Sequence, residues 1–277
     1  MSPASSFFEN LSRIIGRRCI FLRSISSSSD QILLGSDLAL VCRFDCESQY
    51  HSVASVLNSL CSLSTTDCHF PQLLFCDSSR LSNLLVISWL SGDHLLRSQL
   101  DLAFPAVRRV CSSLSEVSVS IENGRDIFEF FSDMIFDALG DIPFFGSYLT
   151  EFSPLPPDIS PCLVHGDLSP QNILATTGSS AYGLIDWEYS GVAYRDFDLG
   201  WYVAVSIFVG CQNLCLIDDA SPNLKYFIRF GYLRLASRII RRKRSYDLLR
   251  MLRGVQSEEV EFHQFQLDFL QQKLLET

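Results

Sequence analysis

The first ninety residues alternate short apolar runs with polar turns, which is the pattern of strands in an antiparallel sheet. The runs that we expect to form strands are 19–25, 31–35, 38–44, 72–76 and 84–90. Apolar side chains at helical spacing predict two helices among these strands. The first helix contains Phe7, Phe8, Leu11, Ile14 and Ile15, and the second covers 47–63.

The N-terminal 29 residues also have the composition of an organelle transit peptide, because they are rich in serine and arginine and contain only Glu9 as an acid. We prefer the structural interpretation of this segment. Its removal would delete the first strand of the predicted sheet.

After residue 93 the apolar positions follow the helical period. Helices are expected over 95–114, with an interruption near Pro105, and over 126–139, 222–240, 245–252 and 257–275. No apolar run reaches the roughly 20 residues of a membrane span. The pattern therefore predicts two lobes, a small sheet lobe of residues 1–90 and a larger, mainly helical lobe of residues 91–277.

The composition narrows the classes of partner and compartment. A net charge of −9 argues against nucleic acid as the main partner and is compatible with a cationic substrate, although ordinary acidity explains it more simply. The ten cysteines form no Cys-x-x-Cys pair, and most lie in apolar runs, where cysteine acts as a small hydrophobe. We expect a reduced, cytoplasmic protein.

The candidate chemistry lies in a polar loop between the apolar runs 162–164 and 173–175. The loop carries His165, Asp167 and Asn172, and a third run ends at Asp186. In phosphoryl transfer from ATP, one carboxylate takes or orients the proton of the attacking hydroxyl, while an amide oxygen and a second carboxylate hold Mg²⁺. A hairpin would bring Asn172 and Asp186 side by side. A hydrolytic metal centre is the weaker alternative, because the segment contains only one histidine.

A family resemblance rests on three motifs: His165-Gly-Asp-Leu-Ser-Pro-Gln-Asn172, Ile185-Asp-Trp-Glu-Tyr189 and Asp196-Phe-Asp-Leu-Gly200. Together they resemble the aminoglycoside phosphotransferase and choline kinase superfamily, and are most similar to its choline, ethanolamine and thiamine kinases. The resemblance implies an α+β, two-lobed protein-kinase-like fold, with a small antiparallel-sheet N-lobe and a larger, mainly helical C-lobe. It also implies ATP and Mg²⁺ as cofactors.

The same resemblance implies roles for residues of the catalytic segment. Asp167 would be the catalytic carboxylate, and His165 would orient the catalytic loop. Asn172 and Asp186 would be the magnesium ligands, and Asp198 would brace the loop.

In the N-lobe, the resemblance implies five contacts with ATP. Ser27 and Ser28 stand in the hairpin that covers the phosphates in the family, and Arg43 stands where the family carries a basic residue that reaches them. Ser88 and Leu90 fall on the hinge that passes the adenine.

The predicted function is ATP-dependent phosphorylation of a hydroxyl group on a small molecule, with choline, ethanolamine and thiamine as the favoured acceptors. An aminoglycoside or sugar kinase of the same superfamily is one alternative. A nucleotide-binding pseudokinase is another, because the loop is rich in serine and no lysine precedes Lys225.

Two further features of the C-terminal half allow more than one interpretation. Trp201 and Tyr202 offer π faces to a quaternary ammonium group, but aromatic residues on a buried helix more often belong to the core. The arginines from Arg234 to Arg253 form a basic belt that could dock an anionic surface. For 241–244 the end of a helix is the simpler explanation.

Overall fold

The computed structural model describes residues 3–26, 29–61, 63, 68–77, 83–117, 126–151, 160–176, 181–211, 220–253 and 259–276. Contacts divide the chain into two compact units, and each unit is described by itself. Unit 1 comprises Met1–His94, Ser120–Arg125 and Asn172–Gly191. Unit 2 comprises Leu95–Val119, Asp126–Gln171 and Val192–Thr277.

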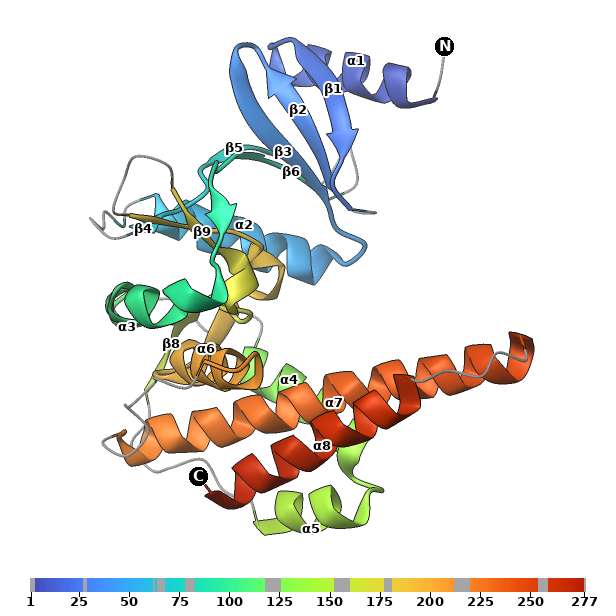
Figure 1. Ribbon diagram of the computed structural model, residues 1–277. Coiled ribbons are helices and arrows are strands. Elements are labelled where there is room, and N and C mark those ends of the chain that lie inside the picture. The colour runs from blue at the N-terminus through green and yellow to red at the C-terminus, as the bar shows by residue number, and fades with distance from the viewer. Residues whose placement is uncertain are drawn as a thin grey trace. The chain divides into compact units, whose positions relative to one another are not determined.

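Unit 1 is built on a five-stranded sheet with the order β1-β2-β3-β6-β5 (Figure 1). The strands are β1 (Cys19–Ser24), β2 (Ser29–Leu34), β3 (Asp37–Arg43), β5 (Leu73–Asp77) and β6 (Leu84–Ser88). Every neighbouring pair in this sheet is antiparallel. The prediction of an antiparallel sheet in the N-terminal part is therefore confirmed.

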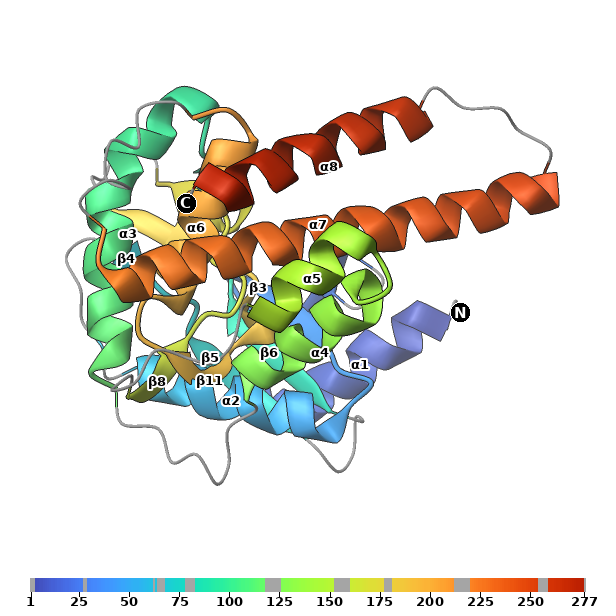
Figure 2. The same cartoon turned by 90° about the horizontal axis from the view of Figure 1, so that it is seen from below.

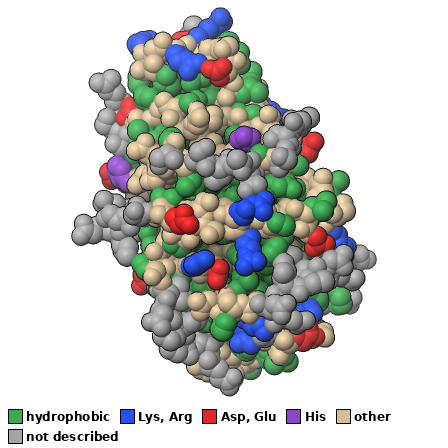
Figure 3. Space-filling view, turned by 90° about the vertical axis from the view of Figure 1, so that its left-hand side faces the viewer, with side chains coloured by type: hydrophobic (Ala, Val, Ile, Leu, Met, Phe, Trp, Pro, Cys, Tyr) green, Lys and Arg blue, Asp and Glu red, His purple; other side chains and the backbone are tan. Residues whose placement is uncertain are grey.

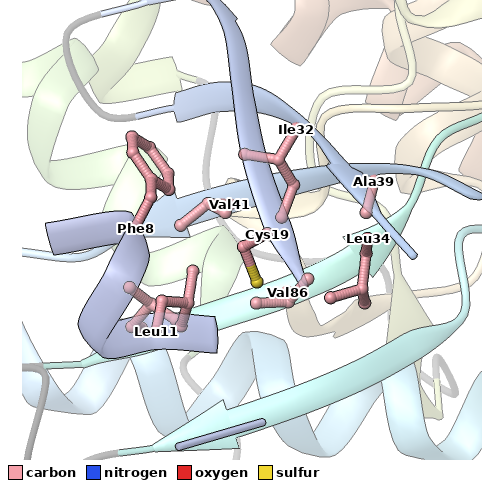
Figure 4. Close-up of a cluster of buried hydrophobic side chains, with 9 residues drawn as sticks. Phe8, Leu11, Cys19, Ile32, Leu34, Ala39, Val41 and Val86 are labelled. Atoms are coloured by element: carbon pink, nitrogen blue, oxygen red, sulfur yellow. The ribbon is translucent and has the colours of Figure 1, made fainter. Parts of the chain in front are cut away.

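Helix α1 (Pro3–Ile15) covers one face of this sheet. Its buried Phe8 and Leu11 meet apolar side chains that alternate along the strands, and Val41 of β3 is among them (Figure 4). The Ser12 hydroxyl accepts a hydrogen bond from the Cys19 N–H at 2.8 Å, which ties the helix to the start of β1. The segment therefore forms the predicted helix and strand.

A second, four-stranded sheet of unit 1 has the order β4-β10-β9-β7. The strands are β4 (Cys68–His69), β7 (Asp93–His94), β9 (Ile173–Ala175) and β10 (Tyr182–Leu184). A 3-10 turn, η4 (Trp187–Tyr189), follows β10. Helix α2 (Glu47–Leu60) holds this segment, because Gln49 donates to the Glu188 carbonyl at 3.0 Å and Ser52 donates to the Ser190 carbonyl at 3.2 Å.

Unit 2 is mainly helical, and its described residues also contain the small strand pair of β8 (Pro161–Val164) with β11 (Gly191–Tyr194). Its helices are η1 (Arg97–Gln99), α3 (Leu100–Ser115), α4 (Ile127–Leu139), α5 (Pro143–Glu151), α6 (Phe197–Phe208), α7 (Pro222–Arg253) and α8 (Glu259–Glu276); the turn η3 (Pro170–Asn172) leads into β9. Helices α7 and α8 lie side by side in both ribbon views (Figures 1 and 2).

Two predicted helix boundaries are wrong. Helix α3 continues through Pro105 without interruption, because Ala103, Phe104, Ala106 and Val107 are all buried around it. Their burial outweighs the roughly 3 kcal/mol that an interior proline costs a helix. Helix α7 is one helix where the sequence predicted a break between 240 and 245, because the basic residues there are good helix formers and no glycine or proline interrupts them.

The exposed residues carry mixed charge. Asp126, Glu129, Asp133 and Asp137 on the outer face of α4 are all exposed, and Asp126 also caps the helix by accepting from the Glu129 N–H at 2.8 Å. On the face drawn in Figure 3, acidic and basic side chains are interspersed. Among the described residues no helix has the length and apolar character needed to cross a bilayer, and the described cysteines are free thiols.

Candidate active site

The predicted catalytic loop follows β8 in unit 2 and is held by a buried carboxylate. Asp198, in the first turn of α6, accepts hydrogen bonds from the His165 N–H at 2.6 Å and from the Gly166 N–H at 2.9 Å. Gly166 has φ of +82°, a left-handed conformation that glycine adopts without a steric cost. Burial raises the pKa of Asp198 to about 6, although the two backbone N–H groups and Arg234 oppose this shift. Asp198 therefore braces the loop as the motif implied.

His165 lies within the loop and is fully buried. Its Nδ1 accepts a hydrogen bond from the Asp167 N–H at 3.3 Å. This contact fixes the backbone of the loop at the residue that carries the candidate catalytic carboxylate. A role of His165 in catalysis stays a prediction.

Asp167 is bound by two arginines of α7. Arg234 Nη2 lies 3.0 Å from Asp167 Oδ1, and Arg238 Nη2 lies 3.1 Å from the same oxygen. Arg234 also donates from Nη1 to the Gly166 carbonyl at 2.7 Å. From the sequence, both arginines were expected only in a basic belt, and this contact was not predicted. The available signal was their spacing of four residues within a helix whose neighbouring residues are apolar.

The aromatic residues next to these arginines belong to the core. The Arg234 guanidinium lies 3.4 Å from the centre of the Phe131 ring and 4.1 Å from that of Trp201, and Arg238 lies 4.8 Å from Trp201. Tyr202 is fully buried and donates to the Leu100 carbonyl at 2.8 Å. The simpler explanation of Trp201 and Tyr202 as core residues is therefore confirmed, and the arginines already contact the Trp201 face.

The predicted magnesium ligands lie at the two ends of one hairpin in unit 1. Strands β9 and β10 pair antiparallel, with Ile173 opposite Leu184, and the Ile185 N–H donates to the Asn172 carbonyl at 3.0 Å. The expected hairpin is thus confirmed. Asp186 has φ of 65°, an uncommon conformation for a non-glycine residue that often marks a functional site.

The donor set of this hairpin fits magnesium. An amide oxygen and a carboxylate are the hard oxygen ligands that Mg²⁺ prefers. Within the described residues no group of three or more His, Cys, Asp or Glu side chains could hold a metal ion. A magnesium ion bound by one or two protein oxygens and by nucleotide phosphates does not need such a group.

Arg43, which we expect to contact the phosphates, already has partners within unit 1. Arg43 pairs with Asp30 at 2.5 Å and lies 4.8 Å above the Phe7 ring, so it is on the face of the sheet that α1 covers. Cys42, the residue before Arg43, lies on the opposite face of the sheet. The pKa of its thiol is raised to about 12, mainly by burial and to a smaller extent by the charges of Asp186 and Glu188. Phosphate contact by Arg43 stays a prediction, and it requires the guanidinium to leave Asp30.

The remaining predicted nucleotide contacts lie in the hairpin and at the end of β6. Ser27 and Ser28 fall outside the described residues. The hydroxyl of Ser88 accepts from the Gln72 N–H at 2.8 Å. Leu90 lies over Gly183 of β10, where an added Cβ would be 3.5 Å from the leucine side chain. The segment predicted to pass the adenine and the hairpin that carries the predicted magnesium ligands are therefore neighbours within unit 1.

Comparisons with known proteins agree with this arrangement. A model of the phosphotransferase enzyme family matches residues 70–237. No curated protein sequence matches the chain.

Three solved structures share the fold. Aminoglycoside 2'-phosphotransferase-IIIa, solved as its GDP complex, aligns with a TM-score of 0.63 and 15% identity over 99% of both chains. Choline kinase LicA from Streptococcus pneumoniae aligns with a TM-score of 0.62 and 14% identity over 99% of both chains. A choline/ethanolamine kinase family protein from Mesorhizobium loti aligns with a TM-score of 0.52 and 14% identity over 99% of this chain and 95% of that one.

These similarities confirm the predicted kinase-like α+β fold, with its antiparallel sheet in the N-terminal part and its helices in the C-terminal part. The matched family segment contains the Asp167 loop, the hairpin from Asn172 to Asp186, and the bracing Asp198. Because that segment covers more than half of the chain, the protein belongs to the phosphotransferase enzyme family, whose members transfer a phosphoryl group to a hydroxyl acceptor.

Proposed function

We propose that the protein transfers the γ-phosphoryl group of ATP to a hydroxyl group of a small molecule. The observation that carries this proposal is the braced loop, in which Asp198 binds two successive backbone N–H groups and thereby fixes the position of Asp167. Family membership supports the same reaction. A structural neighbour solved with GDP supports a nucleotide as the donor.

Each predicted residue has one role in the proposed reaction. The acceptor oxygen attacks the γ-phosphorus, the bond to the ADP oxygen breaks, and Asp167 orients the hydroxyl and takes its proton. Asn172 and Asp186 would hold Mg²⁺, which neutralises charge on the phosphates. His165 keeps the loop in place through its contact with the Asp167 N–H.

The acceptor is tested with a panel of compounds. Choline, ethanolamine and thiamine are the acceptors that the motifs favour, and aminoglycosides and sugars are the alternatives within the superfamily. Purified protein with Mg²⁺ and ATP is incubated with each compound and with homoserine, and the phosphorylated product is detected by mass spectrometry. A product from any of these alcohols supports the proposal. Protein that binds Mg·ATP but phosphorylates none of them favours the second candidate.

The second candidate is a nucleotide-binding pseudokinase. The position of Cys42 favours this candidate. Cys42 lies on the face of β3 that is close to Asp186, and its thiol offers no positive charge to phosphates. Arg43 on the opposite face is held by Asp30 and Phe7.

Arg43→Met separates the possible roles of this arginine. If Arg43 moves to bind phosphates, we expect the Kd of Mg·ATP to rise about 10-fold or more, because a charge-assisted contact is lost. Isothermal titration calorimetry measures the affinity. Arg17→Met is the matched control, because Arg17 forms a comparable but exposed pair with Asp37 at 2.8 Å. Equal affinity of both variants and the wild type would assign Arg43 to the packing of α1 alone.

A further inference from the structure

The α7 residues that approach the catalytic loop form one face of that helix. Arg234 and Arg238 are four residues apart, so they lie one above the other on the helix surface. Both reach Asp167 Oδ1, at 3.0 Å and 3.1 Å. The carboxylate that the proposed reaction uses is thus held from a helix more than sixty residues away in the sequence.

Arg234 has the features of a rigid support. It is only 1% exposed, and its guanidinium contacts the Phe131 and Trp201 rings at 3.4 Å and 4.1 Å. Its two terminal nitrogens bind different atoms of the loop, the Gly166 carbonyl and Asp167 Oδ1. The planar guanidinium makes both contacts from one fixed orientation, which a lysine ammonium cannot do.

The charges around this contact also argue for a role beyond folding. Asp198 accepts from the two N–H groups before Asp167, and Arg234 binds the next carbonyl and the carboxylate itself. Burying a cation between two aromatic rings costs a large desolvation free energy, and an apolar side chain of similar volume is often equally stable there. Precise placement of a reacting group is a recognised reason to keep such a residue.

We propose that Arg234 and Arg238 are positioning residues for phosphoryl transfer, acting through Asp167. Arg234 fixes the loop carbonyl and the carboxylate together, and Arg238, whose side chain is 37% exposed, fixes the same carboxylate oxygen from the solvent side. This inference rests on the proposed function, because it assigns the pair to the orientation of the group that receives the acceptor proton.

The test compares Arg234→Met, Arg234→Lys and Arg238→Met in the full chain with Asp167→Asn and the double variant Asp167→Asn/Arg234→Met. Arg229→Met is the matched control, because Arg229 lies on another face of the same helix. Turnover is followed with the acceptor found in the panel and, separately, with water as acceptor. The melting temperature and the KM for ATP are measured for each variant together with turnover.

We expect kcat to fall about 100-fold in Arg234→Met, since a displacement of about 1 Å has this effect on an oriented group. We expect a fall of about 10-fold in Arg238→Met. The KM for ATP should stay within about two-fold of the wild type, because in this proposal the arginines act on the Asp167 carboxylate and not on ATP binding. Arg234→Lys should recover part of the loss. In the Asp167→Asn background, Arg234→Met should change kcat by less than about two-fold, because residues that act as a unit are not additive.

Three outcomes would overturn the proposal, and they are distinguishable. Wild-type kcat in both Arg234→Met and Arg238→Met would leave the arginines with no positioning role. Equal effects of Arg234→Met in the wild-type and Asp167→Asn backgrounds, together with a lower melting temperature, would show a structural role only. A wild-type chain without turnover of ATP, with any acceptor or with water, would refute the proposed function and this inference with it.

Discussion

Asp198 is the buried carboxylate that holds the backbone of the loop carrying Asp167. Both of its oxygens accept backbone hydrogen bonds, from His165 and Gly166. The ionised form accepts both bonds strongly, whereas protonation turns one oxygen into a hydroxyl that donates and is a weaker acceptor. Burial nevertheless raises the pKa to about 6, so the ionised form is lost at a moderately acidic pH.

The turnover number should therefore fall as the pH drops below about 6, because protonation of Asp198 weakens one of the two bonds that hold the loop. The effect on stability has the opposite sign. The native state binds this proton more tightly than the unfolded chain, whose pKa is 3.8, so the contribution of Asp198 to the free energy of unfolding decreases as the pH rises between these values.

A pH profile of kcat at saturating substrate measures this effect, with Asp198→Asn as the comparison. The variant should be slow at every pH and should lack the step near pH 6. An unchanged step in the variant would assign it to another group.

Local motifs were sufficient to propose Asp167, Asn172 and Asp186 as site residues, because their spacing lies within one loop and one hairpin. The partners of other candidate residues were beyond sequence reasoning. Arg234 meets Asp167 only through the packing of α7, and Asp30 meets Arg43 only through the β2–β3 register, in which Asp30 lies opposite Val41. Such pairs depend on tertiary packing, which periodicity does not encode.

Among the elements, the α6–α7 pair decides where the arginines lie. At Gly200 of α6, an added Cβ would be 2.5 Å from the Phe227 backbone carbon, and at Gly231 of α7 it would be 2.6 Å from Ala204. Phe227, Gly231, Arg234 and Arg238 follow the helical spacing of one α7 face. The two glycines therefore allow the close helix approach that brings this face to the loop carrying Asp167.

Gly200→Ala should push α7 away from α6. The expected loss is about 1–3 kcal/mol in the free energy of unfolding, as for other overpacked sites, which exceeds the gain of up to about 1 kcal/mol in helix propensity. The kcat should fall as well, because Arg234 moves with its helix. Urea unfolding and steady-state kinetics provide the measurements.

Asn223→Ala, in the first turn of α7, is the control for this variant and should leave both quantities near the wild type. Wild-type stability and turnover in Gly200→Ala would contradict the link between helix packing and the loop.

The element types were predicted well where one signal dominated. Alternating apolar runs predicted the strands of the N-terminal sheet, and the periodic apolar positions of 126–139 predicted α4. The helix breaks predicted at Pro105 and after Ile240 were wrong. At Pro105 the packing of buried neighbours outweighed the local signal, and after Ile240 helix propensity did so. The short strands β4 and β7 were missed, since two residues carry no period.

At the scale of the whole molecule, the kinase-like fold was predictable because three motifs identify the family. The division into lobes of residues 1–90 and 91–277 stays a prediction. In the structure, contacts group residues 172–191 with the N-terminal segments, and β9 of this stretch pairs with β7. Chain order alone does not contain such a grouping, because it arises from pairing between strands that are distant in the sequence.

The measurement that tests the central claim most directly is ATP turnover by the wild type and by Asp167→Asn, side by side, with Mg²⁺ and the acceptor panel. Asparagine preserves the shape of the side chain but cannot take a proton. We predict phosphorylation of at least one alcohol by the wild type, a fall of about 100-fold or more in Asp167→Asn, and equal stabilisation of both proteins by Mg·ATP. Equal turnover by the two proteins would contradict the assignment of Asp167 and, with it, the mechanism proposed for this protein.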